Sequence, residues 1–176
     1  MSKANKSNKA IKYRLYPNDE QKVMFAKTFG CCRFVYNQLL ALQKQRYKDG
    51  ESHLSKLKSN EFATRTLKKD YDFLKEIDKF AVSNAVFHLA DAYDRFFKKQ
   101  NHFPKFRSKR KSKKSYTTNF TNNNILIGKN VIKLPKVGMV KAVIHKLPKD
   151  DWKLKSVTVS QDSVGNYFAS VLFEYE

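Results

Sequence analysis

The residues of this chain that are best suited to chemistry are basic. Between Arg95 and Lys149 lie sixteen Lys or Arg residues and no Asp or Glu, and the whole chain has a formal charge of +20. Like charges at this density repel one another unless a polyanion lies against them, and a nucleic acid backbone is the usual polyanion. Aromatic residues are interspersed in the same stretch: Phe96, Phe97, Phe103, Phe106, Tyr116 and Phe120. Disordered basic tails lack such residues, so we expect a folded surface on whose rings bases can stack.

Phosphate contacts are expected from the run between Lys105 and Lys114. The candidate ligands are Lys105, Arg107, Lys109, Arg110 and Lys111. On duplex DNA, each phosphate that such a residue neutralises steepens the log–log salt dependence of binding by about 0.9.

Hydroxyl and amide side chains follow this run and lie next to aromatic residues. Tyr116, Thr121 and Asn122 are the candidates for contact with bases. Asn can form two hydrogen bonds with adenine, and Thr can contact the methyl group of thymine. The simpler alternative for residues 122–124 is a solvent-exposed turn before a strand.

Acidic residues and histidines do not form a recognisable catalytic pattern. A metal-dependent nuclease needs two or three converging carboxylates, whereas Asp91 and Asp94 are more typical of a solvated helix face or of partners for Arg95 and Lys98. The four histidines are scattered, and neither a phosphate-binding P-loop motif nor a G-x-S-x-G motif is present. We therefore predict no catalytic residue, no metal ligand and no cofactor.

Composition limits the class of protein. The chain has 176 residues, of which 41% are hydrophobic, enough for one domain with a core or for a body with an insertion. No apolar run is long enough to cross a bilayer, and residues 1–9 lack the apolar core of a signal peptide. We expect a protein of the cytosol or nucleoid, with no membrane partner. Cys31 and Cys32 are adjacent on a predicted helix, which suits packing better than a disulfide or a zinc site.

The first part of the chain predicts one strand followed by helices. Residues 10–16 alternate apolar and basic side chains up to Pro17, and Asn18 with Gln21 forms a capping-box pattern that begins a helix ending near Lys48. A second, weaker helical segment is expected over residues 55–69 and a stronger one from Asp78 to about residue 100. The residues predicted to point inward on these helices are Phe25, Phe29, Cys32, Tyr36, Leu39, Tyr47, Leu57, Phe62, Leu67, Val82, Val86, Leu89, Tyr93 and Phe96.

After residue 115 the hydrophobic period shortens to two. Short strands are predicted over residues 116–120, 125–127, 131–134, 140–144, 154–160 and 167–173, separated by turns. The strand at residues 10–16 has no partner nearby and is expected to join them. The predicted fold is α+β: a small antiparallel β-barrel of the oligonucleotide-binding type, with a helical bundle inserted after its first strand.

Several motifs, in their order, resemble the TnpB (OrfB) proteins of bacterial insertion sequences. They include residues 12–17, 30–37, 78–81, 103–109, 115–118, 120–124, 133–138 and 167–171, and the resemblance covers nearly the whole chain from residue 10 onward. It implies a wedge-type barrel whose first strand is residues 1–17, a helical recognition lobe and basic connector over residues 18–114, and the rest of the barrel over residues 115–176. A RuvC-like nuclease domain, which follows in the family, is expected to be absent from this chain.

The resemblance also implies site residues and partners. Lys79, Thr121 and Asn122 match the positions that read a short DNA motif beside the target, and Ser59 matches a further contact. Ser55 and Ser83 occupy positions where relatives can carry larger side chains. The implied partners are guide RNA and DNA, with a nuclease domain possible in trans, and the chain alone is expected not to cleave DNA. Two alternatives remain: a stand-alone or degenerate helix-turn-helix repressor, and a subunit of a split RNA-guided nuclease.

Overall fold

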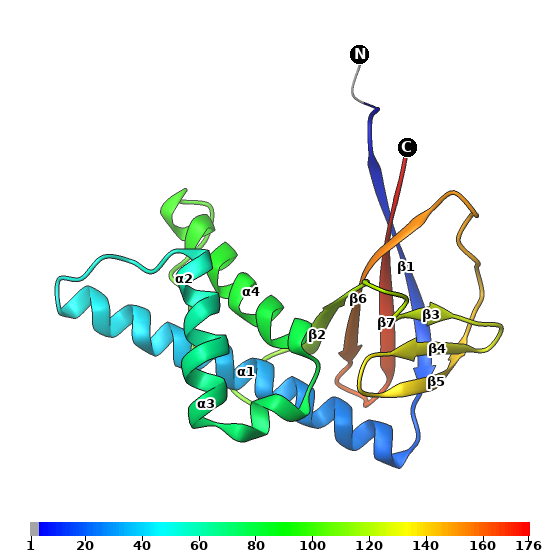
Figure 1. The fold of residues 1–176 in the computed structure, drawn as a ribbon, viewed down its shortest axis with the longest axis horizontal. Helices are drawn as coiled ribbons and strands as arrows, with labels where there is room; N and C mark the ends of the chain where they lie inside the picture. Colours follow the sequence, from blue (N-terminus) through cyan, green and yellow to red (C-terminus); the bar gives the residue numbers. More distant parts are fainter. Residues whose placement is uncertain (1–3) are drawn as a thin grey trace. The chain divides into compact units, whose positions relative to one another are not determined.

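The computed structural model describes residues 4–176 and divides them into two compact units. One unit contains a sheet and comprises the chain up to Phe25 together with Lys113–Glu176. The other is helical and comprises Ala26–Ser112, so it is inserted between the first strand and the others (Figure 1). The α+β class and the insertion after the first strand are confirmed.

Seven antiparallel strands form the sheet. They are β1 (Ser7–Tyr16), β2 (Lys114–Asn119), β3 (Leu126–Ile127), β4 (Val131–Leu134), β5 (Gly138–Val143), β6 (Lys153–Gln161) and β7 (Tyr167–Tyr175), in the order β2-β6-β7-β1-β5-β4-β3. The predicted pairing of the first strand with the later ones is confirmed, because β1 pairs with β7 from Ser7 to Leu15 and with β5 from Arg14 to Tyr16. The predicted closure into a barrel is not found in the described residues, since β2 and β3 lie at the two ends of an open order.

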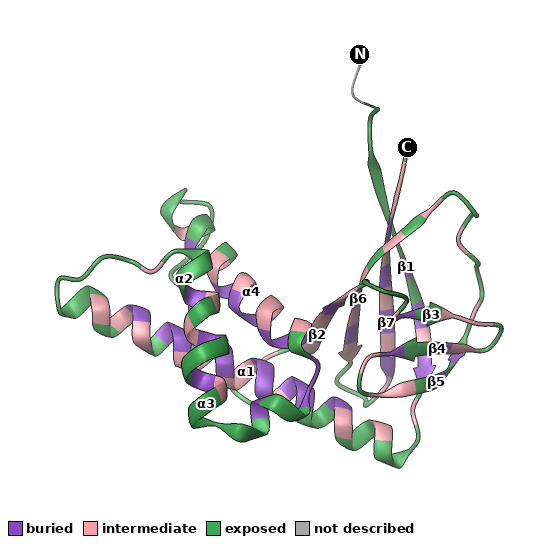
Figure 2. Cartoon of the chain, in the orientation of Figure 1, coloured by how far each residue is buried: buried purple, intermediate pink, exposed green. Residues whose placement is uncertain are grey.

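One face of the sheet is buried, as the alternating pattern requires. On β1, Ile11, Tyr13 and Leu15 are buried, whereas Lys12 and Tyr16 are exposed (Figure 2). Further buried side chains of this unit are Ile125, Ile132, Leu134, Val140, Ala142, Val157, Val159, Ala169, Val171 and Phe173. The opposite face carries basic side chains such as Lys12 and Lys141 together with exposed apolar and aromatic ones such as Tyr16, Met139 and Val143.

Helix α1 (Asp19–Lys48) begins with the predicted capping box. The Asn18 Oδ1 atom accepts a hydrogen bond of 2.8 Å from the Gln21 backbone N–H, and the Asn18 N–H donates one of 3.0 Å to Gln21 Oε1. The Gln21 amide also donates to the Met139 carbonyl on β5. One turn later the Phe25 ring packs against Tyr116 and Tyr167, with centroids 6.2 and 5.6 Å away. The start of α1 is thereby joined to the sheet unit.

Within the helical unit, α1 is followed by α2 (Lys56–Glu61), a π-helix (Phe62–Leu67), α3 (Lys68–Asp70), a 3₁₀-helix (Asp72–Glu76) and α4 (Lys79–Phe97). The core side chains from α1 include Phe29, Cys31, Cys32, Val35, Tyr36, Leu39 and Leu40, and those from α4 include Ala81, Val82, Ala85, Val86, Leu89 and Tyr93. Both cysteines are free and buried, as predicted, and Cys32 Sγ lies 3.4 Å from the Ala81 carbonyl oxygen of α4.

For two of the residues predicted to point inward, Leu57 and Tyr47, the prediction is wrong. Leu57 is 70% exposed because the inward face of this segment is formed by Ser59, Ala63 and Leu67 instead. Tyr47 is 86% exposed. The chain after α1 is held to the end of that helix by polar contacts of Gln43 with Leu54 and of Arg46 with Glu51 and Ser52. Phe62 and Phe96 are half-buried.

Across residues 4–176, no helix is both long enough and apolar enough to cross a membrane.

Candidate nucleic-acid interface

The basic run contains a compact turn at Ser108–Ser112. The Ser108 N–H donates to Ser112 Oγ at 2.9 Å, the Lys111 N–H donates to Ser108 Oγ at 3.0 Å, and the Ser112 N–H donates to the Ser108 carbonyl at 3.1 Å. These bonds fix the backbone, while Lys109, Arg110 and Lys111 remain exposed. Three successive cations are therefore presented on a defined turn, which suits contact with phosphates.

Arg107 behaves differently from the other predicted phosphate ligands. Its guanidinium carbon lies 3.8 Å from the centre of the Tyr36 ring, a close cation–π contact. Its backbone is bound by the Asn37 side chain, which accepts from the Arg107 N–H at 2.8 Å and donates to the Arg107 carbonyl at 2.9 Å. Arg107 thus attaches the basic segment to α1, whereas Lys105 is exposed and available.

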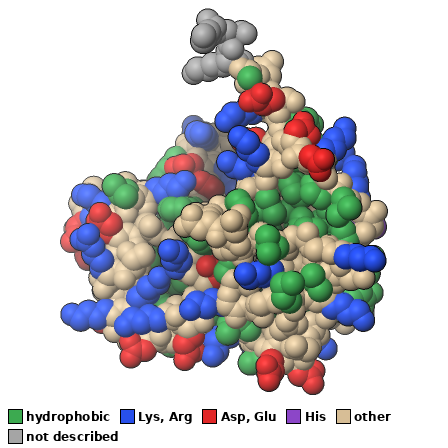
Figure 3. All heavy atoms as spheres, turned by 45° about the vertical axis from the view of Figure 1, so that its right-hand side comes forward, with side chains coloured by type: hydrophobic (Ala, Val, Ile, Leu, Met, Phe, Trp, Pro, Cys, Tyr) green, Lys and Arg blue, Asp and Glu red, His purple; other side chains and the backbone are tan. Residues whose placement is uncertain are grey.

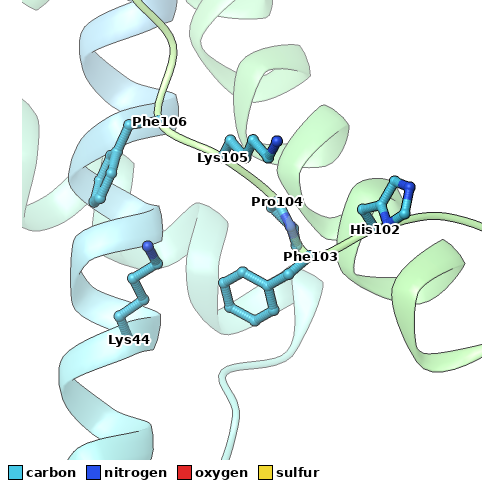
Figure 4. Close-up of a pocket in the computed structure, with 6 residues that line it drawn as sticks. All are labelled: Lys44, His102, Phe103, Pro104, Lys105 and Phe106. Carbon is cyan, nitrogen blue, oxygen red and sulfur yellow. The ribbon is translucent and has the colours of Figure 1, made fainter.

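Phe103 and Phe106 lie on either side of the Lys44 ammonium group. The Lys44 nitrogen is 5.5 Å from the centre of the Phe103 ring and 4.5 Å from that of Phe106 (Figure 4). The three residues line an open hollow of about 600 Å³ together with His102, Pro104 and Lys105. Both rings remain substantially exposed, at 40% and 51%, so a base can reach them as the sequence predicts.

The start of α4 brings charged side chains together. Asp78 is buried and caps the helix by accepting from the Phe80 N–H, and its Oδ2 atom has no hydrogen-bond partner among the described residues. Lys79 is exposed, with its ammonium group 5.3 Å from the Phe80 ring centre. Burial lowers the pKa of Lys68, helped by the positive charge of Lys79 and opposed by Asp78. Ser83 is half-buried one turn further along α4.

Ser55 is exposed, whereas Ser59 is buried. Ser55 caps α2 by accepting a hydrogen bond from the Lys58 N–H, and Ser59 is only 6% exposed. Both line a small cavity of about 90 Å³ beside Val86 and Leu89 of α4. The Ser59 side chain is therefore much less accessible than that of Ser55 in this structure.

Thr121 and Asn122 lie in a tight turn between β2 and β3. Asn122 and Asn123 have φ angles of 47° and 56°, a left-handed conformation that Asn tolerates better than most residues. The Asn124 side chain closes the turn by accepting from the Thr121 N–H and donating to the Asn119 carbonyl. Thr121 and Asn122 are exposed, so the turn expected as the simpler alternative is present and still presents both side chains to solvent.

Tyr116 is unsuited to the stacking role expected from the sequence. It is 3% exposed and packs in the sheet core against Phe25. Its place on a strand is predictable, but which face of the sheet is buried depends on pairing with β6, where Tyr116 opposes Val159. Phe120, the next aromatic residue, is 36% exposed.

A second basic and aromatic surface was missed by sequence reasoning. On the outer face of the sheet, Phe168 of β7 lies opposite Arg14 of β1. The Lys12 nitrogen is 4.5 Å from the Phe168 ring centre, and the Arg14 guanidinium is 5.5 Å from that ring and 4.8 Å from Tyr16. The alternation at residues 10–16 places the basic side chains on one face, but Phe168 reaches them only through long-range pairing.

Acidic and histidine side chains do not converge in the part of the chain that the structure covers. No group of three or more His, Cys, Asp or Glu side chains close enough to hold a metal ion is present in residues 4–176. On the face drawn in Figure 3, exposed hydrophobic side chains lie among Lys and Arg side chains, and acidic side chains are fewer. An antiparallel sheet with an inserted helical unit, exposed cations and accessible rings is a combination typical of proteins that bind nucleic acid.

Comparison with known proteins identifies the family. Residues 5–52 match the family model HTH_OrfB_IS605, described as a helix-turn-helix domain. The chain is 30% identical over 168 residues to a Streptomyces pristinaespiralis protein named "Putative RNA-guided DNA endonuclease", and 29% identical over 174 residues to an Escherichia coli K12 protein of the same name with the suffix InsQ. These alignments cover 94% and 95% of this chain but 41% and 40% of the relatives.

A shorter relative is covered almost completely. The Salmonella dublin protein named virulence protein VsdF is 32% identical over 111 residues, which are 57% of this chain and 93% of that protein. The chain belongs to the TnpB (OrfB) family of insertion-sequence proteins, and it spans about two fifths of the two longer relatives.

The residues matched by the helix-turn-helix model adopt a different arrangement here. They contain β1 and α1, and α1 is one continuous helix of 30 residues that passes through Gly30. The region therefore supplies a strand for the sheet and the longest helix of the helical unit.

Proposed function

We propose that this chain binds nucleic acid as part of a TnpB-type system, engaging a guide RNA and the DNA duplex beside the target. The observation that carries the proposal is the Ser108–Ser112 turn, whose hydrogen bonds hold Lys109, Arg110 and Lys111 exposed, with no ion-pair partner within 4.0 Å in residues 4–176. The names of two relatives support RNA guidance and DNA as the target.

The proposal divides the exposed residues into two roles. Lys105 and the Ser108–Ser112 turn contact phosphates, which positions the nucleic acid without reading its sequence. Lys79 and Asn122 read the short motif next to the target, Lys79 by hydrogen bonds to guanine and Asn122 by hydrogen bonds to adenine. Thr121 directly precedes Asn122 in the chain, and Ser83 lies one helical turn after Lys79. We assign each of them to the same contact as its neighbour. Lys79 and Asn122 belong to different units, and each is proposed as a contact in its own right.

A stand-alone helix-turn-helix repressor is less well supported. Such a protein places a second, recognition helix in the major groove. The matched residues 5–52 hold one strand and one helix, so this stretch offers no helix pair for that geometry.

The test is selection of bound duplexes from a library with a randomised flank, in the presence of guide RNA. The unmodified chain is expected to enrich one short motif. Lys79→Gln and Asn122→Gly should relax the enrichment at one position each while leaving total binding nearly unchanged. The matched controls are Lys75→Gln, which removes a nearby exposed charge, and Asn123→Gly, which alters the same turn.

Two results would count against the proposal. If neither RNA nor duplex is bound at low salt, the binding function is wrong. If Lys79→Gln and Asn122→Gly reduce binding to all sequences equally, or no more than their controls do, the motif-reading role is wrong.

A further inference from the structure

Three lysines converge on the single tryptophan of the chain. The ammonium groups of Lys9, Lys146 and Lys149 lie 5.7, 6.0 and 6.0 Å from the centre of the Trp152 ring. The indole is held by β7, because it stacks on Tyr175 with centroids 5.3 Å apart and contacts Phe173 at 5.8 Å. We call Lys9, Lys146, Lys149 and Trp152 the lysine–tryptophan cluster.

In residues 4–176, the lysines of this cluster form no ion pair within 4.0 Å with an acidic side chain. Glu174, the acid nearest in the β1–β7 register, is bound by Lys6 at 3.5 Å and Lys155 at 4.0 Å. Asp150 and Asp151 are exposed, and neither forms an ion pair within 4.0 Å in residues 4–176.

The lysines also lie close to one another. Hydrogen bonding and repulsion by Lys9 lower the pKa of Lys146, and Lys149 adds to the effect. Ammonium groups that approach this closely are stabilised when an anion lies among them. The geometry therefore matches a group with at least one negative charge and several acceptor oxygens, such as a phosphate.

A groove adjoins the cluster and adds a stacking ring. It is lined by Asn119, Phe120, Trp152, Lys153, Leu154, Lys155 and Ser156, and encloses about 810 Å³. Phe120 is 36% exposed there, and its backbone N–H is fixed by a hydrogen bond of 2.9 Å to the Lys155 carbonyl. A ring at a fixed position beside a cationic track is the combination that proteins use to bind unpaired bases.

We propose that this groove binds a single-stranded segment of nucleic acid, with a phosphate at the lysine–tryptophan cluster and a base on Phe120. A base within a duplex is already stacked and cannot cover an exposed ring in this way, so the groove favours an unpaired strand. The proposal rests on the proposed function only in that the chain binds nucleic acid. It adds a site made entirely from the sheet unit, separate from the Ser108–Ser112 turn.

The fluorescence of Trp152 can report on binding at this site directly, because Trp152 is the only tryptophan in the sequence. Intrinsic fluorescence is to be measured while a 12-nucleotide oligouridylate is added, and anisotropy of the same labelled oligonucleotide reports binding independently. We expect a saturable fluorescence change whose midpoint falls at the same oligonucleotide concentration as that of the anisotropy curve. The matching duplex should give a smaller change at the same concentration.

Two triple variants distinguish binding at this site from non-specific attraction to the positive charge of the chain. Replacing Lys9, Lys146 and Lys149 by Gln should weaken single-strand binding at least tenfold and lower the salt slope by about 0.7 for each phosphate that is no longer neutralised. Replacing Lys129, Lys133 and Lys136 by Gln removes the same charge elsewhere on the sheet unit and should have a much smaller effect. Phe120→Leu should weaken single-strand binding more than duplex binding. Circular dichroism checks that each variant is folded.

Several outcomes would overturn the assignment. Binding by anisotropy without a fluorescence change places the strand elsewhere and leaves the proposed function intact, whereas no binding by either method removes both. Equal losses in the two triple variants indicate non-specific attraction. A full fluorescence change with inorganic phosphate alone, and no tighter binding of the oligonucleotide, makes the cluster a phosphate site rather than a strand-binding groove.

Discussion

Asn37 and Arg107 are joined by two hydrogen bonds between a side chain and a backbone 70 residues away in the sequence. The Asn37 amide accepts from the Arg107 N–H and donates to the Arg107 carbonyl, and the Arg107 guanidinium packs on the adjacent Tyr36 ring. Together these contacts fix the start of the basic segment on α1. The position of the phosphate-binding turn that follows depends on them.

Asn37→Ala is expected to destabilise the chain. It leaves a part-buried N–H and carbonyl of Arg107 without their partner, which costs roughly 1–3 kcal/mol of unfolding free energy. Urea unfolding followed by circular dichroism measures the loss. The control is Gln38→Ala, a half-buried neighbour on the same helix for which a change within about 0.5 kcal/mol is expected. Similar losses in both variants would show that the two hydrogen bonds are unimportant.

Local patterns predict the elements of this fold well. The alternation at residues 10–16, the Asn18–Gln21 capping box and the Asp78 cap all depend on neighbouring residues, and each is present in the structure. Membership of the TnpB family also follows from motifs in the sequence. The neighbours of β1 in the sheet could be expected only in outline, since pairing with β5 and β7 joins residues more than a hundred positions apart.

The candidate site is less predictable, because composition does not distinguish an exposed ring or cation from one engaged in packing. Tyr116 and Phe120 are four residues apart, yet one is in the core and the other borders a groove. Arg107 and Lys109 are both basic, yet one is bound to Tyr36 and the other is exposed. The lysine–tryptophan cluster draws on residues near 9, 146 and 152, so only the folded sheet brings them together.

Two variants of Asn122, in the turn at Thr121–Asn124, can distinguish an effect on folding from an effect on recognition. Asn122 has a positive φ, so Asn122→Ala should lose about 1 kcal/mol of unfolding free energy through backbone strain. Asn122→Gly relieves that strain and should stay within about 0.5 kcal/mol of the unmodified chain. Thermal or urea unfolding of both variants tests this. If glycine were as destabilising as alanine, the Asn122 side chain would itself be stabilising the turn, and Asn122→Gly would no longer report on recognition alone.

The two cysteines are expected to be slow to react in the native state. Burial raises the pKa of both thiols, and the raised value reduces the thiolate that thiol reagents attack. Cys31 and Cys32 are also only 4% and 5% exposed. Reaction with a chromogenic disulfide at pH 8 should therefore be slow until urea unfolds the chain, and then release two equivalents. Rapid release of either equivalent from the folded chain would mean that this part of α1 opens readily.

Neutralising the Ser108–Ser112 turn should alter the salt dependence of duplex binding. With Lys109, Arg110 and Lys111 replaced by Gln, each phosphate that is no longer neutralised lowers the log–log slope by about 0.9, so a reduction of up to about 2.7 is expected. The same triple replacement at Lys69, Lys75 and Lys98 removes equal charge from exposed positions of the same unit. Anisotropy titrations between 50 and 200 mM salt, roughly the range over which such contacts are resolved, compare the two. If the turn contacts phosphates directly, the variant of Lys109, Arg110 and Lys111 must show the larger reduction in slope. Charge that acts only at a distance is screened within about 10 Å and would affect both triple variants alike.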